Sequence, residues 1–587
     1  MPHSRFCWSL PLIVLASCLG QQIVVADAAD AKFTELVDEL WEYDISEDPL
    51  LATSTGDHRF NDRLPAVSLA DSERRNRRRR EFLTRVEALD RGQLSRVGQM
   101  NYDILVRQLR DDLAEFDFQS HLIPITQRDG FHIEFPQLPQ DVPLATVKDY
   151  ENYAARLRAF ADYTEGHIEL LRAGIAEGQV LAAVVLEGWE KSIVSQIVEQ
   201  PTQSLLYAPC KQFPTTVGAG DHERLRTEVI AAISDSVIPA YGRFQRFMAE
   251  EYVPQSRGSI GASALPGGRD FYRHRVRRFT TVDTTPEEVH QIGLGEVARI
   301  RGEMDAIIKR VKFEGDFAAF TNFLRSDPQF YAQTEKELLQ HVSFALKAMD
   351  GQLPKLFGRL PRMPYGLKPV PDYIAPRTTA AYYERPSGDG TKAGFFNMNT
   401  YNLKNRPLYT VEALSFHEAV PGHHLQLALQ QEIESLPNFR KFGGFTAFVE
   451  GWALYSERLG LEAGFYEDPY SDFGRLTMEI WRACRLVVDT GIHYFGWSRE
   501  KAIAYMTENS AMSDHNIRAE VDRYISWPGQ ALAYKTGELK IRELRKLCED
   551  QLGERFDVRA FHDMVLGSGA VPLDVLEANT KAWLEEQ

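Results

Sequence analysis

Cysteine is scarce in this chain. Its 587 residues include five cysteines, of which Cys7 and Cys18 lie close to the N-terminus. The other three, Cys210, Cys484 and Cys548, are too few and too widely spaced for a disulfide framework or for a metal site built from thiolates. A metal site in this protein would therefore rest on histidine and carboxylate side chains.

Positive charge is also in short supply. The formal net charge is −16, and the dense basic run from Arg74 to Arg80 lies inside a helical pattern bounded by glutamates. We predict that this run is a solvated helix face. Binding to nucleic acid requires clustered lysines and arginines that release counterions, so no nucleic-acid partner is expected.

Long apolar runs are missing except near the N-terminus. Phe6 to Gly20 is almost wholly apolar but too short to span a bilayer, which is typical of an export signal. Cleavage after Ala26-Asp-Ala28 would make residues 1–28 a signal peptide. Alternatively, Leu15-Ala-Ser-Cys18 is similar to a bacterial lipobox and would place a lipid anchor on Cys18. We expect an exported protein, periplasmic or lipid-anchored to the cell envelope, without a transmembrane span.

Several common catalytic motifs are absent. The chain has no G-x-S-x-G elbow, no phosphate-binding P-loop and no G-x-G-x-x-G after a strand. These absences argue against serine hydrolases, nucleotide hydrolases and dinucleotide-dependent enzymes. At 44% hydrophobic and 26% charged residues, the composition is that of a globular protein with a large core.

Helical periodicity dominates the chain. Apolar residues recur at three-and-four spacing in Lys32–Tyr43, Tyr150–Ala176, Glu223–Glu250 and Glu287–Val311. Thr285-Pro-Glu-Glu288 has the form of a helix start, because the threonine and glutamate side chains can cap each other's backbone amides.

Proline and glycine become dense between Gly351 and Arg406, which predicts a small β-sheet. From Pro407 onward the pattern is helical again. We therefore predict a mainly α fold with an N-terminal helical lobe over residues 30–350 and a second lobe, containing the sheet, over residues 351–587.

The segment from Ser415 to Gln426 reads SFHEAVPGHHLQ and opens like the zinc-binding sequence H-E-x-x-H, whose two histidines share one helix face. Pro421 has no N–H for the carbonyl of His417, so the helix must open there. If the widened turn absorbs two residues, His423 becomes the second ligand. His424 is the rival, because seven residues restore the same face of a straight helix.

A third ligand is expected about one helix later. Glu450 and Glu457 lie on one otherwise apolar helical stripe, and a buried carboxylate needs a partner. We predict Glu450 as the third zinc ligand, Glu457 as the group that orients a ligand histidine, and His424 as a further group beside the ligands. The alternative is that both glutamates face water or an arginine such as Arg458.

These two segments, HEAVPGHHLQ and FVEGWALYSE, resemble domain of unknown function 885, a mostly bacterial family with an HExxPGHH pattern. Further matches are Leu265–Gly268, Thr284–Leu294, Val488–His493, Gly496–Glu500 and Pro528–Lys535. More distantly, the pattern is similar to the helical zinc peptidases thimet oligopeptidase, angiotensin-converting enzyme and carboxypeptidase Taq. In the first and third of these, a second glutamate follows the ligand glutamate by seven positions, as Glu457 follows Glu450. The insertion of two residues before His423 departs from their pattern.

The residues and the resemblance point to the same chemistry. Glu418 follows the first ligand directly and can act as general base toward a zinc-activated water. The negative charge that develops on the substrate carbonyl oxygen requires a hydrogen-bond donor from another part of the chain. We predict Tyr524 in this role, with Tyr534 and His493 as further candidates that would contact the substrate.

The extended run Gly394–Thr400 is a candidate for an edge strand that pairs with a substrate backbone. Asn397 and Asn399 would then contact the substrate through their side chains. An ordinary structural edge strand explains the same run equally well.

The sequence thus predicts a peptidase of the gluzincin type that binds one Zn²⁺ and hydrolyses oligopeptides. The resemblance implies two helical lobes around a channel, with residues 351–587 as the catalytic lobe that holds the metal-binding helices. Two alternatives stay open. In the first, the chain is a non-catalytic peptide-binding protein that retains a zincin-like fold. In the second, it is a structural envelope protein whose histidines form hydrogen bonds in the core.

Overall fold

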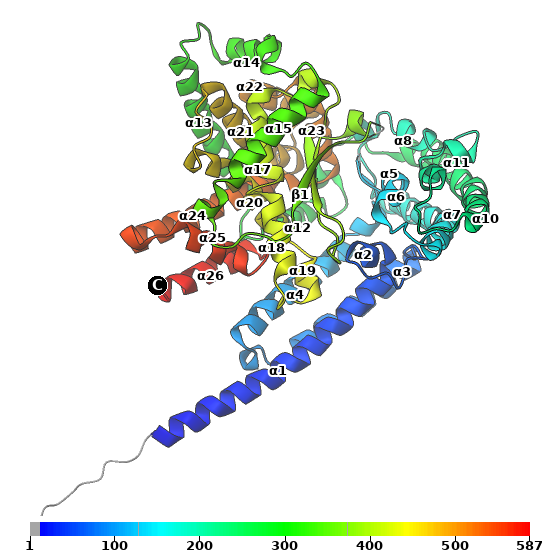
Figure 1. The fold of residues 1–587 in the computed structure, drawn as a ribbon, viewed down its shortest axis with the longest axis horizontal. Helices are drawn as coiled ribbons and strands as arrows, with labels where there is room; N and C mark the ends of the chain where they lie inside the picture. Colours follow the sequence, from blue (N-terminus) through cyan, green and yellow to red (C-terminus); the bar gives the residue numbers. More distant parts are fainter. Residues whose placement is uncertain (1–11, 127, 373) are drawn as a thin grey trace, which may run out of the picture.

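Helices form most of the molecule in the computed structural model, which describes residues 12–126, 128–372 and 374–587 (Figure 1). The predicted mainly α class is confirmed. A long first helix runs along one side and three helices follow it: α1 (Leu12–Glu47), α2 (Pro49–Ser54), α3 (Leu69–Glu87) and α4 (Arg96–Asp117). The basic run lies on α3, where Arg78 pairs with Glu39 of α1 and Arg80 pairs with Asp117 of α4.

A group of helices gathers on one side of the molecule (Figure 1). It contains α5 (Phe131–Glu134), α6 (Leu138–Asp141), α7 (Val147–Glu177), α8 (Glu190–Val194), α9 (Ala208–Lys211), α10 (Ala219–Ala232) and α11 (Ile238–Phe247). The predicted helix over Tyr150–Ala176 is α7. The predicted helix over Glu223–Glu250 comprises most of α10, all of α11 and a π-helical turn between them, Ile233–Val237.

The chain then returns to the larger body. Four helices precede the sheet: α12 (Gly268–Thr280), α13 (Pro286–Arg310), α14 (Phe317–Ser326) and α15 (Glu335–Asp350), followed by the short α16 (Leu353–Leu356). The start of α13 was predicted correctly. The backbone N–H of Glu288 donates to Thr285 Oγ1, and the backbone N–H of Thr285 donates to the Glu288 carboxylate at 2.9 Å.

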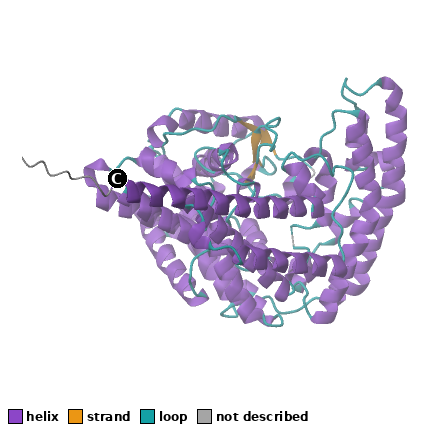
Figure 2. Cartoon of the chain, turned by 90° about the horizontal axis from the view of Figure 1, so that it is seen from below, coloured by secondary structure: helices purple, strands orange, loops and turns teal. Residues whose placement is uncertain are grey.

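A small three-stranded sheet lies among the helices (Figure 2). Its strands are β1 (Tyr365–Pro369), β2 (Ala381–Glu384) and β3 (Gly394–Met398), in the order β1-β3-β2. β1 is parallel to β3, with Gly366 opposite Phe395, and β2 is antiparallel to β3, with Tyr383 opposite Phe396. The sheet appears where it was predicted. The prediction that Gly394–Thr400 is an edge strand is wrong, because β3 has a neighbour on both sides.

The second half of the chain is helical after the sheet. Its helices are α17 (Val411–Glu418), α18 (His423–Glu432), α19 (Asn438–Lys441), α20 (Thr446–Glu462), α21 (Pro469–His493), α22 (Arg499–Asn509), α23 (Asp514–Ser526), α24 (Ala533–Leu552), α25 (Val558–Gly567) and α26 (Leu573–Glu585). Almost every residue of α21 is buried, and α21 packs along α13 and α20 packs along α24. These pairs form the centre of the body.

The hydrophobic core does not divide at residue 350. The largest cluster of buried apolar residues contains Phe160 and Phe244 as well as Ile480 and Val521. A second cluster surrounds the sheet, α17 and α20. The predicted boundary between two lobes at 350 stays a prediction.

The predicted export signal lies mostly outside the described residues. Residues 1–11 are not described, and neither are the side chains of residues 12–27, which include Cys18 and all of both processing sequences except Ala28. Over the described part of the chain, we find no helix that combines the length and the apolar character needed to cross a bilayer.

Candidate metal centre

The segment HEAVPGHH forms two helices joined by a short loop. The predicted opening at Pro421 is present, and the carbonyl of Pro421 accepts a hydrogen bond from Trp452 Nε1 at 2.9 Å. Gly422 must be glycine, because a Cβ at this position would lie 2.0 Å from the carbonyl oxygen of His417. This tight connection holds the start of α18 against the end of α17. The ring centroids of His417 and His423 are therefore 4.8 Å apart.

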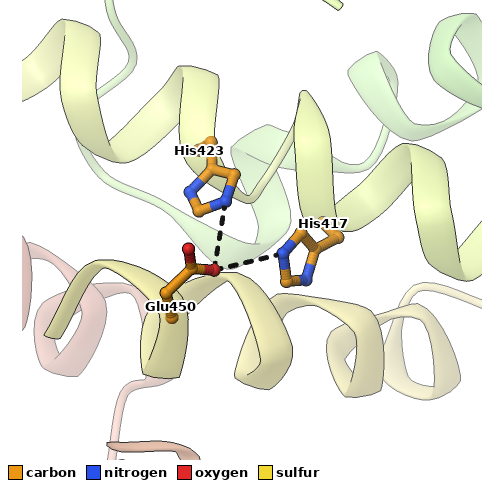
Figure 3. A group of neighbouring side chains, drawn as sticks. All are labelled: His417, His423 and Glu450. Atoms are coloured by element: carbon orange, nitrogen blue, oxygen red, sulfur yellow. Dashed lines mark ion pairs between the residues drawn. The ribbon is translucent and has the colours of Figure 1, made fainter. Parts of the chain in front are cut away.

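Three side chains converge on one point (Figure 3). Nε2 of His417 and Nε2 of His423 each lie 3.5 Å from Oε2 of Glu450, and the ligand atoms of all three residues lie within 4.8 Å of one another. Two atoms bound about 2.1 Å from one zinc ion at a tetrahedral angle are about 3.4 Å apart. Oε2 of Glu450 is buried and has no hydrogen-bond partner among the described residues. The donor set and its spacing therefore fit a zinc ion.

The second ring nitrogen of His417 contacts another carboxylate. Its Nδ1–H donates to Glu457 Oε1 at 2.8 Å, which in the neutral ring leaves the lone pair on Nε2, facing Glu450. Glu457 also lies 3.5 Å from Arg482 Nη2. Burial lowers the pKa of His417, but the nearby carboxylates of Glu450 and Glu457 outweigh it and raise the pKa to about 9. The site therefore favours positive charge, as a cation site should.

A close helix crossing sets the position of Glu450. α20 and α24 meet at Gly451 and Gly537, where a Cβ on Gly537 would lie 1.8 Å from the carbonyl oxygen of Ala447 and 2.7 Å from the Cα of Gly451. No larger residue fits between the two backbones. Because Glu450 directly precedes Gly451, this crossing determines how far its carboxylate reaches toward α17 and α18.

Glu418, the predicted general base, is the last residue of α17 and is buried. Burial raises the pKa of its carboxyl group, while the imidazoles of His417 and His423 lower it. In the chain, Glu418 directly follows His417, one of the three converging residues. A carboxyl group in this position is suited to accept and release a proton. Its role as base stays a prediction.

His424 does not join the ligands. Tyr383 OH and His424 Nδ1 are 2.8 Å apart, and His424 Nε2 lies 3.1 Å from the carbonyl oxygen of Met363. Burial lowers the pKa of His424 to about 4, so the ring is neutral and joins α18 to β2 and to the segment before β1. The structure therefore supports neither His424 as the second ligand nor His424 as a group beside the ligands.

The two candidate tyrosines differ in their surroundings. Burial and the carboxylate of Glu450 raise the pKa of Tyr534. The hydroxyl oxygen of Tyr524 instead accepts hydrogen bonds from Trp481 Nε1 and Arg485 Nε, both at 3.0 Å. The Tyr524 hydroxyl is thus engaged by α21, and the roles predicted for Tyr524 and Tyr534 stay predictions.

His493 is a structural residue. Its Nδ1 accepts a hydrogen bond from the backbone N–H of Ala262 at 2.9 Å, and its Nε2 donates to the carbonyl of Tyr524 at 2.9 Å. Burial lowers the pKa of His493 to about 3, so the ring is neutral. Both nitrogens are engaged in the core, and the predicted contact of His493 with substrate is not supported.

The two predicted asparagine contacts are not supported either. Asn397 is completely buried in the central strand, and its Nδ2 donates to the carbonyl of Phe395 at 3.2 Å. Asn399 is also completely buried. Its Nδ2 donates to three carbonyls of the segment before β2, those of Ala375, Thr378 and Thr379. Asn399 therefore shapes the connection between strands.

A cavity of about 1100 Å³ borders the centre without including its ligands. Leu414, one turn before Glu418 on α17, and Trp481, next to Arg482 on α21, form part of its wall. The wall also contains residues of the helix group α5 to α11, among them His132 and Lys191. Tyr382 of β2, which is an edge strand of the sheet, forms part of the cavity wall. The predicted edge strand, β3, is the central strand.

Our sequence analysis missed the buried arginines of α21. Arg482 contacts Glu457, and Arg485 contacts both Tyr524 and Glu520. A signal was present, since the two arginines lie three positions apart within a long apolar pattern. Such placement indicates paired, buried charges.

Comparisons with known proteins place the chain among bacterial relatives. A family model described as "Bacterial protein of unknown function (DUF885)" matches residues 49–579. The crystal structure of a candidate lipoprotein from Colwellia psychrerythraea is 30% identical, covers 95% of this chain and 100% of its own, and has a TM-score of 0.91. The structure of a candidate lipoprotein of unknown function from Shewanella oneidensis shares the fold at 17% identity, 94% and 99% coverage and a TM-score of 0.68. The comparison with curated proteins gave no match.

Proposed function

The chain belongs to DUF885, the bacterial family of unknown function that its motifs resemble, and we propose that it is a zinc-dependent peptidase with a gluzincin-like fold. One observation carries the proposal: Nε2 of His417, Nε2 of His423 and Oε2 of Glu450 converge in a buried place. Two imidazoles and one carboxylate are the donor set of known catalytic zinc sites, which keep a further position for water or substrate.

The residues around this point supply the other parts of a hydrolytic site. Zinc in such a site activates water as a nucleophile and polarises the carbonyl of a peptide bond. Glu418 would take the proton of the attacking water on a carboxylate oxygen and deliver it to the leaving amine nitrogen. The hydroxyl of Tyr534 would donate to the carbonyl oxygen as negative charge develops there. Glu457 and Arg482 would hold the ring of His417 in place.

The cavity supports an oligopeptide as substrate. Its volume of about 1100 Å³ lies just above the range of small-molecule pockets, roughly 300–1,000 Å³. An edge strand and two groups of helices contribute to its wall. A folded protein would not enter such a space. We place the two lobes of the proposed fold on either side of this cavity.

The proposed location is the cell envelope. The apolar N-terminal run and the Leu15-Ala-Ser-Cys18 sequence favour export with a lipid anchor on Cys18, and two proteins with the same fold are described as candidate lipoproteins. Cleavage after Ala28, which would give a periplasmic protein, is the alternative.

Elemental analysis followed by peptide digestion tests the proposal. We expect one zinc ion per chain and cleavage of members of a mixed peptide library, detected by mass spectrometry. Glu418→Gln should keep the zinc and lose at least about 100-fold in turnover, because the proton acceptor is removed. The matched control is Glu434→Gln, which changes an exposed glutamate beyond α18 and should leave turnover unchanged.

Two outcomes would replace the proposal. Zinc bound and peptides bound but none cut would identify a peptide-binding protein that retains the metal site. The alternative outcome is purified protein that contains no stoichiometric metal, and a His417→Ala variant that is less stable but unchanged in peptide binding and cleavage. This outcome would identify a structural envelope protein.

A further inference from the structure

The first turn of α18 is attached to the sheet through His424. This residue directly follows the candidate ligand His423 and is 1% exposed. Its backbone N–H donates to the carbonyl of Ala419 at 3.0 Å, across the loop that separates the two candidate histidine ligands. The position of the His424 ring therefore fixes the backbone from which the side chain of His423 extends.

The ring of His424 has a hydrogen-bond partner at each nitrogen. The carbonyl of Met363 can only accept, so Nε2 carries a proton and donates to it at 3.1 Å. In the neutral ring Nδ1 is then an acceptor, and the hydroxyl of Tyr383 donates to it at 2.8 Å. Because the ring is buried, loss of the Tyr383 hydroxyl would leave Nδ1 without a donor. Tyr383 therefore determines the orientation of His424.

Tyr383 reaches His424 across the central strand of the sheet. A Cβ at Gly394 of β3 would lie 2.0 Å from the hydroxyl oxygen of Tyr383 and 2.8 Å from its Cζ, so only glycine leaves room for this ring. Tyr365 of β1 pairs with Gly394, and its ring centroid lies 4.9 Å from that of His424. All three strands thus contribute to the position of this histidine.

The strand that carries Tyr383 also borders the cavity. Tyr382 of β2 forms part of the cavity wall. Successive side chains of a strand point to opposite faces, so β2 presents one tyrosine to the cavity and the next one to α18. A molecule that lies against Tyr382 therefore contacts the strand whose next residue holds His424.

The loop between the two candidate histidine ligands has a second attachment, which leads elsewhere. The carbonyl of Pro421 accepts a hydrogen bond from Trp452 on α20, the helix that also carries Glu450. This bond joins the loop to the third candidate ligand, and Trp452 does not belong to the cavity wall. Of the two attachments, the one through the sheet is the one that connects the cavity to the candidate metal centre.

We propose that Tyr383 is a positioning residue that couples the cavity to the metal centre, so that a peptide against β2 and a zinc ion at His423 strengthen each other's binding. A peptide on Tyr382 holds β2 where Tyr383 reaches His424, and a bound zinc ion holds the same arrangement from the side of His423. Coupling of this kind is reciprocal, because each ligand favours the arrangement that the other needs. The proposal rests on the proposed zinc site and on the cavity as the peptide site.

The variant Tyr383→Phe tests the positioning role, because it removes one hydroxyl and keeps the ring that Gly394 accommodates. We expect zinc affinity to fall about 10-fold, measured by competition with a chelator, as for other groups that orient a metal ligand. The visible absorption bands of cobalt(II) bound in place of zinc should shift, because they respond to the arrangement of the ligands. The control Tyr153→Phe removes a buried hydroxyl of α7 that donates to the carbonyl of Leu206 at 2.7 Å. It should change neither zinc affinity nor the cobalt spectrum.

A second measurement tests the coupling. Zinc affinity is determined with and without the mixed peptide library in proteins that also carry Glu418→Gln, so that the peptides stay intact. With Tyr383 present, the peptides should raise zinc affinity at least about 5-fold. With Tyr383→Phe the two affinities should be nearly equal, and with Tyr153→Phe the increase should remain.

The outcomes separate this proposal from the proposed function. Equal zinc affinities and cobalt spectra of the native chain and Tyr383→Phe would overturn the positioning role and leave the peptidase proposal intact. Peptides that have no effect on zinc affinity, or the same effect with and without the Tyr383 hydroxyl, would overturn the coupling. Coupling that Tyr383→Phe abolishes in a protein that cleaves nothing would support the link and contradict the peptidase. Native protein that binds no zinc would overturn both.

Discussion

Glu457 is a residue whose single carboxylate holds two buried groups. It accepts the Nδ1–H of His417 and lies beside the guanidinium of Arg482. Because its side chain is 2% exposed, removal of its charge would leave Arg482 buried and unpaired. We therefore expect Glu457 to contribute both to the metal affinity of the proposed zinc site and to stability.

Glu457→Gln should lower zinc affinity about 10- to 100-fold, because the amide orients His417 more weakly. It should also lower the free energy of unfolding by about 3 kcal/mol through the unpaired Arg482. Competition with a zinc chelator and chemical denaturation measure the two effects. Glu462→Gln, on the same helix, breaks a more exposed pair with Arg545 and should cost no more than about 1 kcal/mol without changing zinc affinity. Equal zinc affinities of the native chain and Glu457→Gln would contradict this role.

Sequence spacing was sufficient to predict that the side chains of His417, His423 and Glu450 converge. Pro421 forces the helix to open, and a helical wheel places Glu450 and Glu457 on one face, so both facts follow from local geometry. The structure does not support the roles predicted for His424 and Asn399, because a polar residue near a motif looks the same in sequence whether it meets a ligand residue, a substrate or a backbone carbonyl. Only the positions of the sheet and its connections decide between the two.

At the scale of elements, the crossing of α20 and α24 positions Glu450, the proposed carboxylate ligand. Gly451 and Gly537 allow the two backbones to touch. Sequence analysis predicted helices here and in α7 and α13, because periodicity and caps are local signals. It could not predict which helices cross, nor that β3 is central, because both depend on partners distant in the sequence.

Gly537→Ala should push α24 away from α20, since the new Cβ meets the carbonyl of Ala447. We expect a loss of about 1–3 kcal/mol in the free energy of unfolding and a weaker zinc affinity, because Glu450 moves with its helix. Gly302→Ala in α13 is the matched control. A Cβ there meets nothing within 4 Å, so this change should raise stability by about 0.5–1 kcal/mol and leave zinc affinity unchanged. The crossing would have no positioning role if Gly537→Ala bound zinc as tightly as the native chain.

At the scale of the whole molecule, buried charges join distant parts of the chain. Lys535 of α24 is completely buried and contacts Glu296 of α13 at 3.0 Å and Glu479 of α21 at 2.8 Å. This network crosses the boundary predicted at residue 350. Sequence patterns do not reveal such a network, because each charged residue on its own resembles a solvated one.

Asp489 of α21 is a second such link and gives the protein a pH dependence. It accepts hydrogen bonds from Tyr272 OH at 2.6 Å and from the backbone N–H of Gly529 at 3.1 Å. Burial raises its pKa from 3.8 to about 7, although these hydrogen bonds lower it. The folded state therefore binds this proton more tightly than the unfolded state. The resulting stability is complete below pH 3.8 and is lost as the pH rises to about 7.

Asp489→Asn should remove this dependence, because the amide resembles the neutral carboxyl group and still accepts both hydrogen bonds. The two proteins should be similarly stable near pH 4, and the variant should become the more stable one as the pH rises, by at most about 1.4 kcal/mol per pH unit up to neutrality. Chemical denaturation at a series of pH values measures the difference, in which the titration of all other groups cancels. A difference that stays constant between pH 4 and pH 8 would show that Asp489 is ionised throughout this range in the folded protein, and that the contacts with Tyr272 and Gly529 outweigh its burial.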